Sequence, residues 1–241
     1  MSNKALVWVR DDFRINNNDA LTYASNNHDL VTAVFIFNNN IFDNKREAQK
    51  WWLSKSLENF RSDLKKLNIG LEIIKDDEIN FFSKLKSNNK ITIYWNKVYE
   101  PAELDKDNKI EKDLTNKKID FKFFKGNVLN EYNKITKNDG TPFKVYSPFW
   151  RNAEQYYLER LPNKINKVKK CKKIEVLFKR QIKPEEILPK SKWYMKFEKY
   201  WIPSESRAQE YLDNFVNKNI LNYGVDRDFP SINGTSKLSP Y

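Results

Sequence analysis

The chain has 241 residues and a mass of 28.9 kDa, which is enough for one large domain or two modest ones. Hydrophobic residues make up 39% of it and aromatic residues 15%, a composition that supports a folded core and excludes a disordered protein. A single cysteine, Cys171, and a single histidine, His28, exclude a disulfide framework and a multi-cysteine zinc site, so no metal site is expected.

The net charge is strongly positive. The chain has 44 basic and 32 acidic residues, a formal net charge of +12 and a pI near 9.4. This balance is typical of proteins that bind nucleic acids, because lysine and arginine neutralise phosphates. A genome-wide compositional bias toward lysine and asparagine produces the same excess, so charge alone leaves both interpretations open.

The N-terminus and the apolar segments show no sign of secretion or membrane insertion. No window approaches ~18 uninterrupted apolar residues. The chain reaches a strand-like run at residues 5–9 without a basic region, an apolar signal core or a cleavage site. The expectation is a cytoplasmic protein with no membrane partner.

Short apolar runs alternate with helical patterns over the first 125 residues. Strands are predicted at residues 5–9, 31–37, 71–74, 91–95 and 119–124, and helices at 18–24, 46–67, 78–86 and 103–114. The helix at 46–67 is the clearest, because large apolar residues recur there in steps of three and four. These residues are Leu53, Leu57, Phe60, Leu64 and Leu67. Five strands separated by four helices predict an α/β fold with a five-stranded parallel, doubly wound sheet.

Sheets of this kind bind nucleotide-type ligands at the carboxyl ends of their strands. The five glycines stand at positions 70, 126, 140, 224 and 234. They are too scattered for a G-x-G-x-x-G fingerprint or a P-loop. A dinucleotide dehydrogenase and a P-loop ATPase are therefore excluded.

The sequence changes character after residue 124. Residues 125–145 are rich in turn signals, and residues 161–200 combine many lysines with three prolines, which is typical of a linker lying over a surface. The basic run at residues 169–173 fits either a solvated face or a phosphate contact. A helix is predicted again at residues 205–215, so the chain enters a second, helical region late.

A cluster of charges follows the first strand. Arg10, Asp11, Asp12 and Arg14 stand within five positions of one another. Such charges are most often solvated, and the alternative is that the arginines pair with acids across a domain boundary. Neither interpretation identifies a reaction.

Six sequence blocks together resemble the family of DNA photolyases and cryptochromes, specifically the N-terminal half of a class I cyclobutane pyrimidine dimer photolyase. The blocks are LVWVRDDFR at 6–14 with NDAL at 18–21, VYEP at 98–101, GTPFKVYSPFW at 140–150, WIPSE at 201–205, YGVDRDFP at 223–230 and GTSKLSPY at 234–241. They occur in the order found in the family, and the last two belong to the family's flavin site.

The resemblance implies a Rossmann-like α/β domain at residues 1–130, an interdomain linker at 131–200 and the beginning of an all-α FAD-binding domain at 201–241. In such proteins, light-excited reduced FAD donates an electron to a flipped-out pyrimidine dimer in DNA, which then splits. The chain would then be the N-terminal part of a monomeric DNA repair enzyme. It would contain no catalytic residue and would be inactive alone.

The same resemblance assigns site residues. Tyr223 matches a flavin-contacting tyrosine, and Arg227 matches an arginine at the DNA-facing mouth, although an ion pair with Asp226 or Asp228 is an equal alternative. The segment that grips the FAD phosphates matches Thr235, Ser236, Lys237, Leu238 and Ser239. Hydroxyls, backbone N–H groups and a nearby cation suit an anion.

Two departures from the family bear on the expected cofactors. Where folate-binding relatives have an Asn-Glu pair, this chain has Ala102 and Glu103, which leaves Glu103 as the candidate antenna residue and argues against a folate. Ser204 replaces a usual glycine. The seven tryptophans fall outside the family's electron-relay positions and are expected to pack in the core or between domains.

Two other functions remain open. A cryptochrome-type photoreceptor would share the fold and the cofactor. A stand-alone nucleotide-binding or interaction domain would lack catalysis, and residues 201–241 would then be disordered or packed against the α/β domain.

Overall fold

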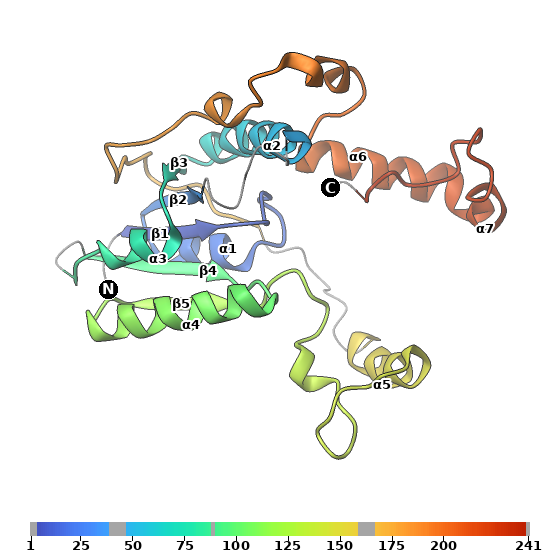
Figure 1. Cartoon of the computed structure of the whole chain (residues 1–241), viewed down its shortest axis with the longest axis horizontal. Coiled ribbons are helices and arrows are strands. Elements are labelled where there is room, and N and C mark those ends of the chain that lie inside the picture. The colour runs from blue at the N-terminus through green and yellow to red at the C-terminus, as the bar shows by residue number, and fades with distance from the viewer. Residues whose placement is uncertain (1–3, 39–46, 88–89, 159–166, 240–241) are drawn as a thin grey trace.

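The computed structural model describes residues 4–38, 47–87, 90–158 and 167–239, and its centre is a five-stranded sheet (Figure 1). The strands are β1 (Lys4–Val9), β2 (Leu30–Phe37), β3 (Gly70–Lys75), β4 (Ile91–Asn96) and β5 (Phe121–Phe124). All neighbouring pairs are parallel, and the order across the sheet is β3-β2-β1-β4-β5. The predicted doubly wound α/β fold is confirmed.

Helices cover both faces of the sheet. The cover consists of α1 (Asp19–Asn27) and α2 (Glu47–Lys66) on one face and α3 (Glu78–Ser83) and α4 (Pro101–Asn116) on the other. Alternate residues of each strand enter opposite cores. In β1, Val7 packs with the α1 and α2 side, whereas Trp8 packs against Phe82 of α3 with ring centroids 4.9 Å apart. Both faces are therefore buried, as parallel sheets require.

The predicted apolar face of α2 is confirmed for Leu53, Leu57, Phe60 and Leu64, which are all buried. Leu67 lies just beyond the end of α2 and is only partly buried against the same core. The element ends differ from the expected ones. Helix α3 stops at Ser83, α4 begins two residues early at Pro101, and β5 begins only at Phe121. Strand β5 begins where its pairing with β4 begins, with Phe121 opposite Ile93, and such pairing is invisible to local periodicity. Helix α4 begins at a proline, which suits the first helical position.

The segment after β5 contains a helix that the turn signals did not predict. This segment contains the short η3 (Tyr132–Lys134), and the unpredicted helix is α5 (Tyr146–Leu158). Helix α5 lies apart from the sheet, beyond its carboxyl end (Figure 1). Few of its described side chains are buried, Ala153 being one that is.

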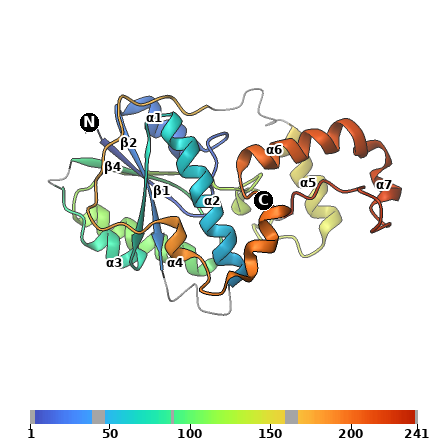
Figure 2. The same cartoon turned by 90° about the horizontal axis from the view of Figure 1, so that it is seen from above.

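Residues 167–200, here called the linker strap, return along the sheet and cross the outer side of α2 (Figure 2). The strap contains η4 (Pro184–Ile187) and η5 (Lys192–Lys199). It is fastened to the body by long-range hydrogen bonds: the Cys171 amide donates to the Leu67 carbonyl at 2.8 Å, and the Ile182 amide to the Ile73 carbonyl at 2.9 Å.

Residues 205–239, here called the C-terminal arm, project away from the sheet (Figures 1 and 2). The arm contains α6 (Glu205–Asn214), η6 (Phe215–Asn219), η7 (Ile220–Asn222) and α7 (Tyr223–Asp226). The predicted helix at 205–215 is confirmed, and the Ser204 hydroxyl caps it by accepting the Arg207 amide at 3.2 Å. No residue of α6 or α7 is buried.

Candidate functional site

The sheet has one topological switch point, between β1 and β4. The connection after β1 leads to β2 on one side, whereas β4 and β5 lie on the other. The loops after β1, β4 and β5 enclose a cavity of about 350 Å³ there, here called the switch-point cavity. Its lining residues include Asp11, Arg14, Lys97, Tyr99 and Asn127. Open α/β sheets bind ligands at this position.

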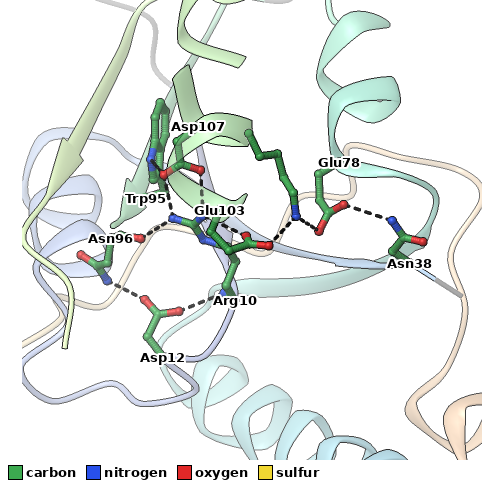
Figure 3. Close-up of polar contacts among 9 residues, drawn as sticks. Arg10, Asp12, Asn38, Glu78, Trp95, Asn96, Glu103 and Asp107 are labelled. Atoms are coloured by element: carbon green, nitrogen blue, oxygen red, sulfur yellow. Dashed lines mark hydrogen bonds and ion pairs between the residues drawn. The ribbon is translucent and has the colours of Figure 1, made fainter. Parts of the chain in front are cut away.

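A buried polar cluster shapes the loop after β1 (Figure 3). The Asn96 side-chain amide donates to the Asp12 carboxylate and, at 2.9 Å, to the Asn18 side-chain oxygen. Asn18 in turn caps α1 by accepting the Leu21 amide at 3.1 Å. The strand ends and the first helix are thereby fixed to one another.

Arg10 lies at the centre of this polar cluster, and its side chain is only 9% exposed. Its guanidinium donates to the Asp107 carboxylate at 2.8 Å and to the Asn96 carbonyl at 2.7 Å (Figure 3). The guanidinium also lies over the Trp8 ring, 4.2 Å from its centroid. The expectation of solvated charges is therefore wrong for Arg10 and Asp12, which are both buried. The alternative of a pair across a domain boundary is also wrong for Arg10, because Asp107 belongs to α4 of the same α/β body.

Asp107 is held between opposing electrostatic effects. Burial raises the pKa of its carboxyl, and the Arg10 guanidinium and the Trp95 indole N–H, 3.3 Å away, act in the opposite direction. A charge pair this deep is tolerated only because each member satisfies the other. It is a structural clamp between β1 and α4.

Glu103, the candidate antenna residue, belongs to the same network. One carboxylate oxygen accepts from Lys106 at 2.8 Å, and the other lies 3.7 Å from Arg10. Lys106 also bonds Glu78 at 3.0 Å, and Glu78 accepts from Asn38 (Figure 3). Burial lowers the pKa of Lys106, but the two glutamates more than offset it and the pKa is raised. Glu103 does not line the switch-point cavity.

Tyr99 and Gly126 form one wall of that cavity. The Tyr99 hydroxyl donates to Glu131 at 2.9 Å and accepts the Gly126 amide at 3.2 Å. Burial, with the nearby Glu131, raises the pKa of Tyr99 to about 12, so the hydroxyl stays protonated. A Cβ at Gly126 would lie 1.8 Å from the Lys97 carbonyl oxygen, so only glycine fits there.

The predicted FAD and DNA residues all lie in the arm. Arg227, Thr235 and Lys237 line one cavity of about 260 Å³, together with residues of the turn at 229–233. Tyr223, Ser236, Leu238 and Ser239 do not line it. Tyr223 is 39% exposed and packs edge-on against Phe215 with ring centroids 5.5 Å apart.

Gly234 allows residues 234–239 to lie close against α7. A Cβ at this position would lie 2.5 Å from the Asp226 Cβ and 2.8 Å from the Asp226 carbonyl oxygen. Lys237 adopts the left-handed region with φ +54°. The close approach brings Thr235 and Lys237 to the same side as Arg227, whose Nε lies 3.7 Å from Asp228 in an exposed ion pair.

A third cavity, of about 580 Å³, was not anticipated from the sequence. It lies between the loop after β1, α2 and the start of α6, and its lining residues include Phe13, Arg14, Trp52, Ser204 and Glu205. The Glu205 carboxylate closes it by accepting the Ile15 and Asn16 amides at 2.7 and 3.1 Å. The only sequence signal was the WIPSE block, which gave no hint of the partner loop.

The part of the chain that the structure describes contains no group of three or more histidine, cysteine, aspartate or glutamate side chains arranged to hold a metal ion. In the same residues, no helix has the length and apolar character needed to cross a membrane.

Comparison with known proteins identifies relatives that share this architecture. The sequence model of the DNA photolyase family matches residues 5–167. A deoxyribodipyrimidine photo-lyase of Agrobacterium fabrum is 30% identical over 98% of this chain and 49% of the relative, and Cryptochrome-2 of Arabidopsis thaliana is 26% identical over 100% of this chain and 40% of the relative. The chain thus spans about half the length of the curated relatives it matches.

Two solved photolyase structures have a similar fold. A bacterial class III photolyase from Agrobacterium tumefaciens superposes with a TM-score of 0.86 and 29% identity, covering 100% of this chain and 50% of that one. An archaeal photolyase from Sulfolobus tokodaii, described with two FAD molecules, shares the fold at a TM-score of 0.68 and 19% identity over 98% of this chain and 51% of that one. The similar structure from Agrobacterium is of class III, whereas the sequence blocks suggested class I. The buried α/β body, the strap and the family match together show that this chain belongs to the DNA photolyase family.

Proposed function

We propose that this chain contributes the α/β domain, the linker and the first FAD-binding segment of a light-dependent enzyme that splits cyclobutane pyrimidine dimers in DNA. The proposal keeps the boundaries 1–130, 131–200 and 201–241 for these three parts, and it takes the enzyme to be a cytoplasmic monomer. The observation that carries it is the shared cavity of Arg227, Thr235 and Lys237, residues that the family resemblance assigned to the flavin and DNA sites.

The residues present suit the diphosphate of FAD. Thr235 and Lys237 are exposed, Ser236 is half-buried, and Arg227 adds a second cation beside them. Ser236 accepts only a long hydrogen bond from the Leu238 amide, at 3.4 Å, so its hydroxyl is available to an incoming oxygen. When bound, reduced FAD would supply the light-excited electron that opens the dimer. Thr235, Ser236 and Lys237 would hold the phosphates, and Tyr223 and the Leu238–Ser239 backbone would orient the cofactor.

Flavin binding is the direct test. The purified chain is titrated with FAD and followed by flavin fluorescence, alongside Lys237→Gln and, as a matched control, Lys218→Gln, an exposed lysine on the same arm. We expect weak FAD binding by this chain, reduced by Lys237→Gln and unchanged by Lys218→Gln. Equal affinities for both variants would contradict the assignment of Lys237.

A cryptochrome-type photoreceptor is the second candidate, because Cryptochrome-2 of Arabidopsis thaliana also aligns with the whole chain. Light-dependent repair of a dimer-containing oligonucleotide by the complete protein would favour the photolyase. A third candidate is a non-catalytic interaction domain. Protection of residues 201–241 from limited proteolysis in the isolated chain would favour it.

We also propose the switch-point cavity as the position of an antenna chromophore. It occupies the edge at which doubly wound sheets bind nucleotides, and the Sulfolobus photolyase is described as implying a novel light-harvesting cofactor in that protein. Glu103 remains the candidate antenna residue, but its carboxylate would have to leave Lys106 to reach a ligand. The test measures the absorbance of a bound antenna chromophore in the purified variants. An absorbance that is reduced in Tyr99→Phe and unchanged in Glu103→Gln would favour the switch-point cavity over Glu103 as the binding position.

A further inference from the structure

The positive charge of this chain is concentrated in one part of it. Residues 1–130 contain 22 basic and 19 acidic side chains, residues 131–200 contain 18 and 8, and residues 201–241 contain 4 and 5. The middle segment thus holds a net charge of +10 out of +12. A compositional bias of the genome would raise the lysine content everywhere, so it does not explain this distribution.

The strap buries some of its apolar side chains, while Ile174 and Val176 are exposed, and it directs its cations outward. Cys171, Ile187 and Tyr194 are buried, and Ile182 packs against the core of the α2 face. The exposed cations of the strap's first half are Lys167, Lys169, Lys170, Lys172, Lys173, Lys179, Arg180 and Lys183. The exposed cations therefore form two groups along the strap, at residues 167–173 and 179–183, and together they make this segment strongly cationic.

Backbone contacts hold this cationic segment in place. The Lys169 amide donates to the Ser25 hydroxyl at 2.9 Å, and the Lys172 amide donates to the Asp29 carbonyl at 3.1 Å. Further along, the buried Glu72 carboxylate accepts the Leu177 and Phe178 amides at 2.6 and 2.9 Å. Because the backbone is already ordered, a polyanion that binds here has only the lysine side chains to immobilise.

Most of these cations have no anionic partner. Within the described residues, the ammonium groups of Lys169, Lys170 and Lys173 make no ion pair and no hydrogen bond. Lys172 pairs with Asp29 at 2.8 Å, and its side chain is still 72% exposed. Lys65, on the last turn of α2 beside the strap, is exposed as well.

Residues 169–175 of the strap lie at the amino ends of the strands, opposite the switch-point cavity. Lys4, Asp29 and Asn68 precede or begin β1, β2 and β3, and all three contact the strap, through Glu175, Lys172 and the Cys171 carbonyl. The cavity lies instead at the carboxyl ends of the strands. A ligand bound to this part of the strap therefore does not compete for the switch-point cavity.

We infer that the linker strap is a second, sequence-independent binding surface for the phosphate backbone of nucleic acid. A row of single cations along an extended segment matches a linear polyanion, since a DNA duplex carries one negative charge per about 1.7 Å of its axis. The surface needs neither a lesion nor flavin. It would hold undamaged DNA and so raise the local concentration of the substrate proposed above.

The test measures binding of a fluorescently labelled, undamaged duplex of about 20 base pairs to the full chain in the dark without flavin, by anisotropy over a range of salt concentrations. The strap variant is Lys169→Gln/Lys170→Gln/Lys173→Gln. The control is Lys86→Gln/Lys109→Gln/Lys112→Gln, three exposed lysines on the α3 and α4 side with the same change in net charge.

We expect the strap variant to lose tenfold or more in affinity at about 0.1 M salt, and the slope of log K against log salt to fall by about 0.9 for each lost phosphate contact. The control should change by less than about twofold. Acetylation of the wild-type lysines, read by mass spectrometry, supplies a measurement that needs no variant: the duplex should protect Lys169, Lys170 and Lys173, and leave Lys86 and Lys109 reactive.

Three results would overturn the inference. They are equal losses for the strap and control variants, no salt-dependent binding by the wild type, and tighter binding to anionic lipid vesicles that the strap variant abolishes. The last outcome would assign the strap to a membrane surface. Because no lesion, light or flavin is used, these results are independent of whether the chain forms part of a photolyase.

Discussion

The α/β body and the C-terminal arm differ in how deeply their side chains are buried. In the body, Trp95 is fully buried, and Arg10 and Asp107 are paired inside the protein. In the arm, Leu221 is 95% exposed and Val225 is 65% exposed, although the arm contains every residue assigned to FAD. The body is therefore organised before any ligand binds. Glu205 fastens the start of the arm to the loop after β1, and contacts among the arm's own residues shape most of the rest. Variants in the two regions should fail in different ways.

The largest effect is expected in the body. Asp107→Asn leaves the buried Arg10 guanidinium with only the more distant Glu103 carboxylate, 3.7 Å away, and we expect a loss of about 3 kcal/mol in the free energy of unfolding. Asp113→Asn is the control on the same helix, because its pair with Lys117 is partly exposed and is worth about 1 kcal/mol or less. Urea denaturation followed by circular dichroism measures both. Similar losses would mean that the buried clamp contributes no more than a surface pair.

In the arm, Gly234→Ala should act locally. The new Cβ would clash with Asp226, and overpacking of this kind costs about 1–3 kcal/mol. We expect tryptic cleavage at Arg227 and Lys237 to accelerate several-fold while the cooperative unfolding of the body is unchanged. Gly224→Ala is the matched control, since nothing lies within 4 Å of the Cβ it adds. A drop in the body's stability would show that the two regions are coupled.

The strap allows a pH test of its fastening to the body. Burial raises the pKa of Glu72 above its usual 4.5, and the Leu177 and Phe178 amides offset this only in part. The folded state therefore binds this proton more tightly, so the contribution of Glu72 is fully present below about pH 4.5 and is lost as the pH rises through the raised pKa.

Glu72→Gln removes this titration. We expect the stability of the wild type relative to the variant to fall as the pH rises through that window and to be constant above it. Urea denaturation from about pH 4 to pH 8 measures the difference. Glu58→Gln, at an exposed position of α2, is the control. A difference that does not vary with pH would show that Glu72 plays no part in the strap's pH response.

The smallest effect is expected at the wall of the switch-point cavity. Tyr99→Phe removes the hydroxyl that joins Glu131 to the Gly126 amide, at a cost of about 0.5–1.5 kcal/mol. Tyr146→Phe, whose ring is 70% exposed, should be neutral. Thermal unfolding compares the two variants. If Tyr99→Phe left the thermal stability unchanged, the cavity wall would resemble the loosely held arm more than the tightly packed body.

Local pattern was sufficient for the sheet and for one helix face. The period of three and four residues in α2 identified Leu53, Leu57 and Leu64 as buried, and they are. Helix α5 was not predicted from the sequence, because the proline and the turn residues before it are typical of irregular structure. The family blocks indicated which segments to propose for the flavin site, but only the folded arm shows that Arg227, Thr235 and Lys237 share a cavity while Tyr223 lies outside it.

Periodicity and composition thus account for the strands, their order along the chain and the concentration of lysine between residues 131 and 200, because these depend on near neighbours and on counts. The fate of the charges after β1 depends on residues far away. Arg10 meets Asp107 across 97 positions, and Glu72 receives amides from more than 100 positions away. Whether a charge is solvated or paired is set by the surroundings that folding assembles, and no local window of sequence contains them.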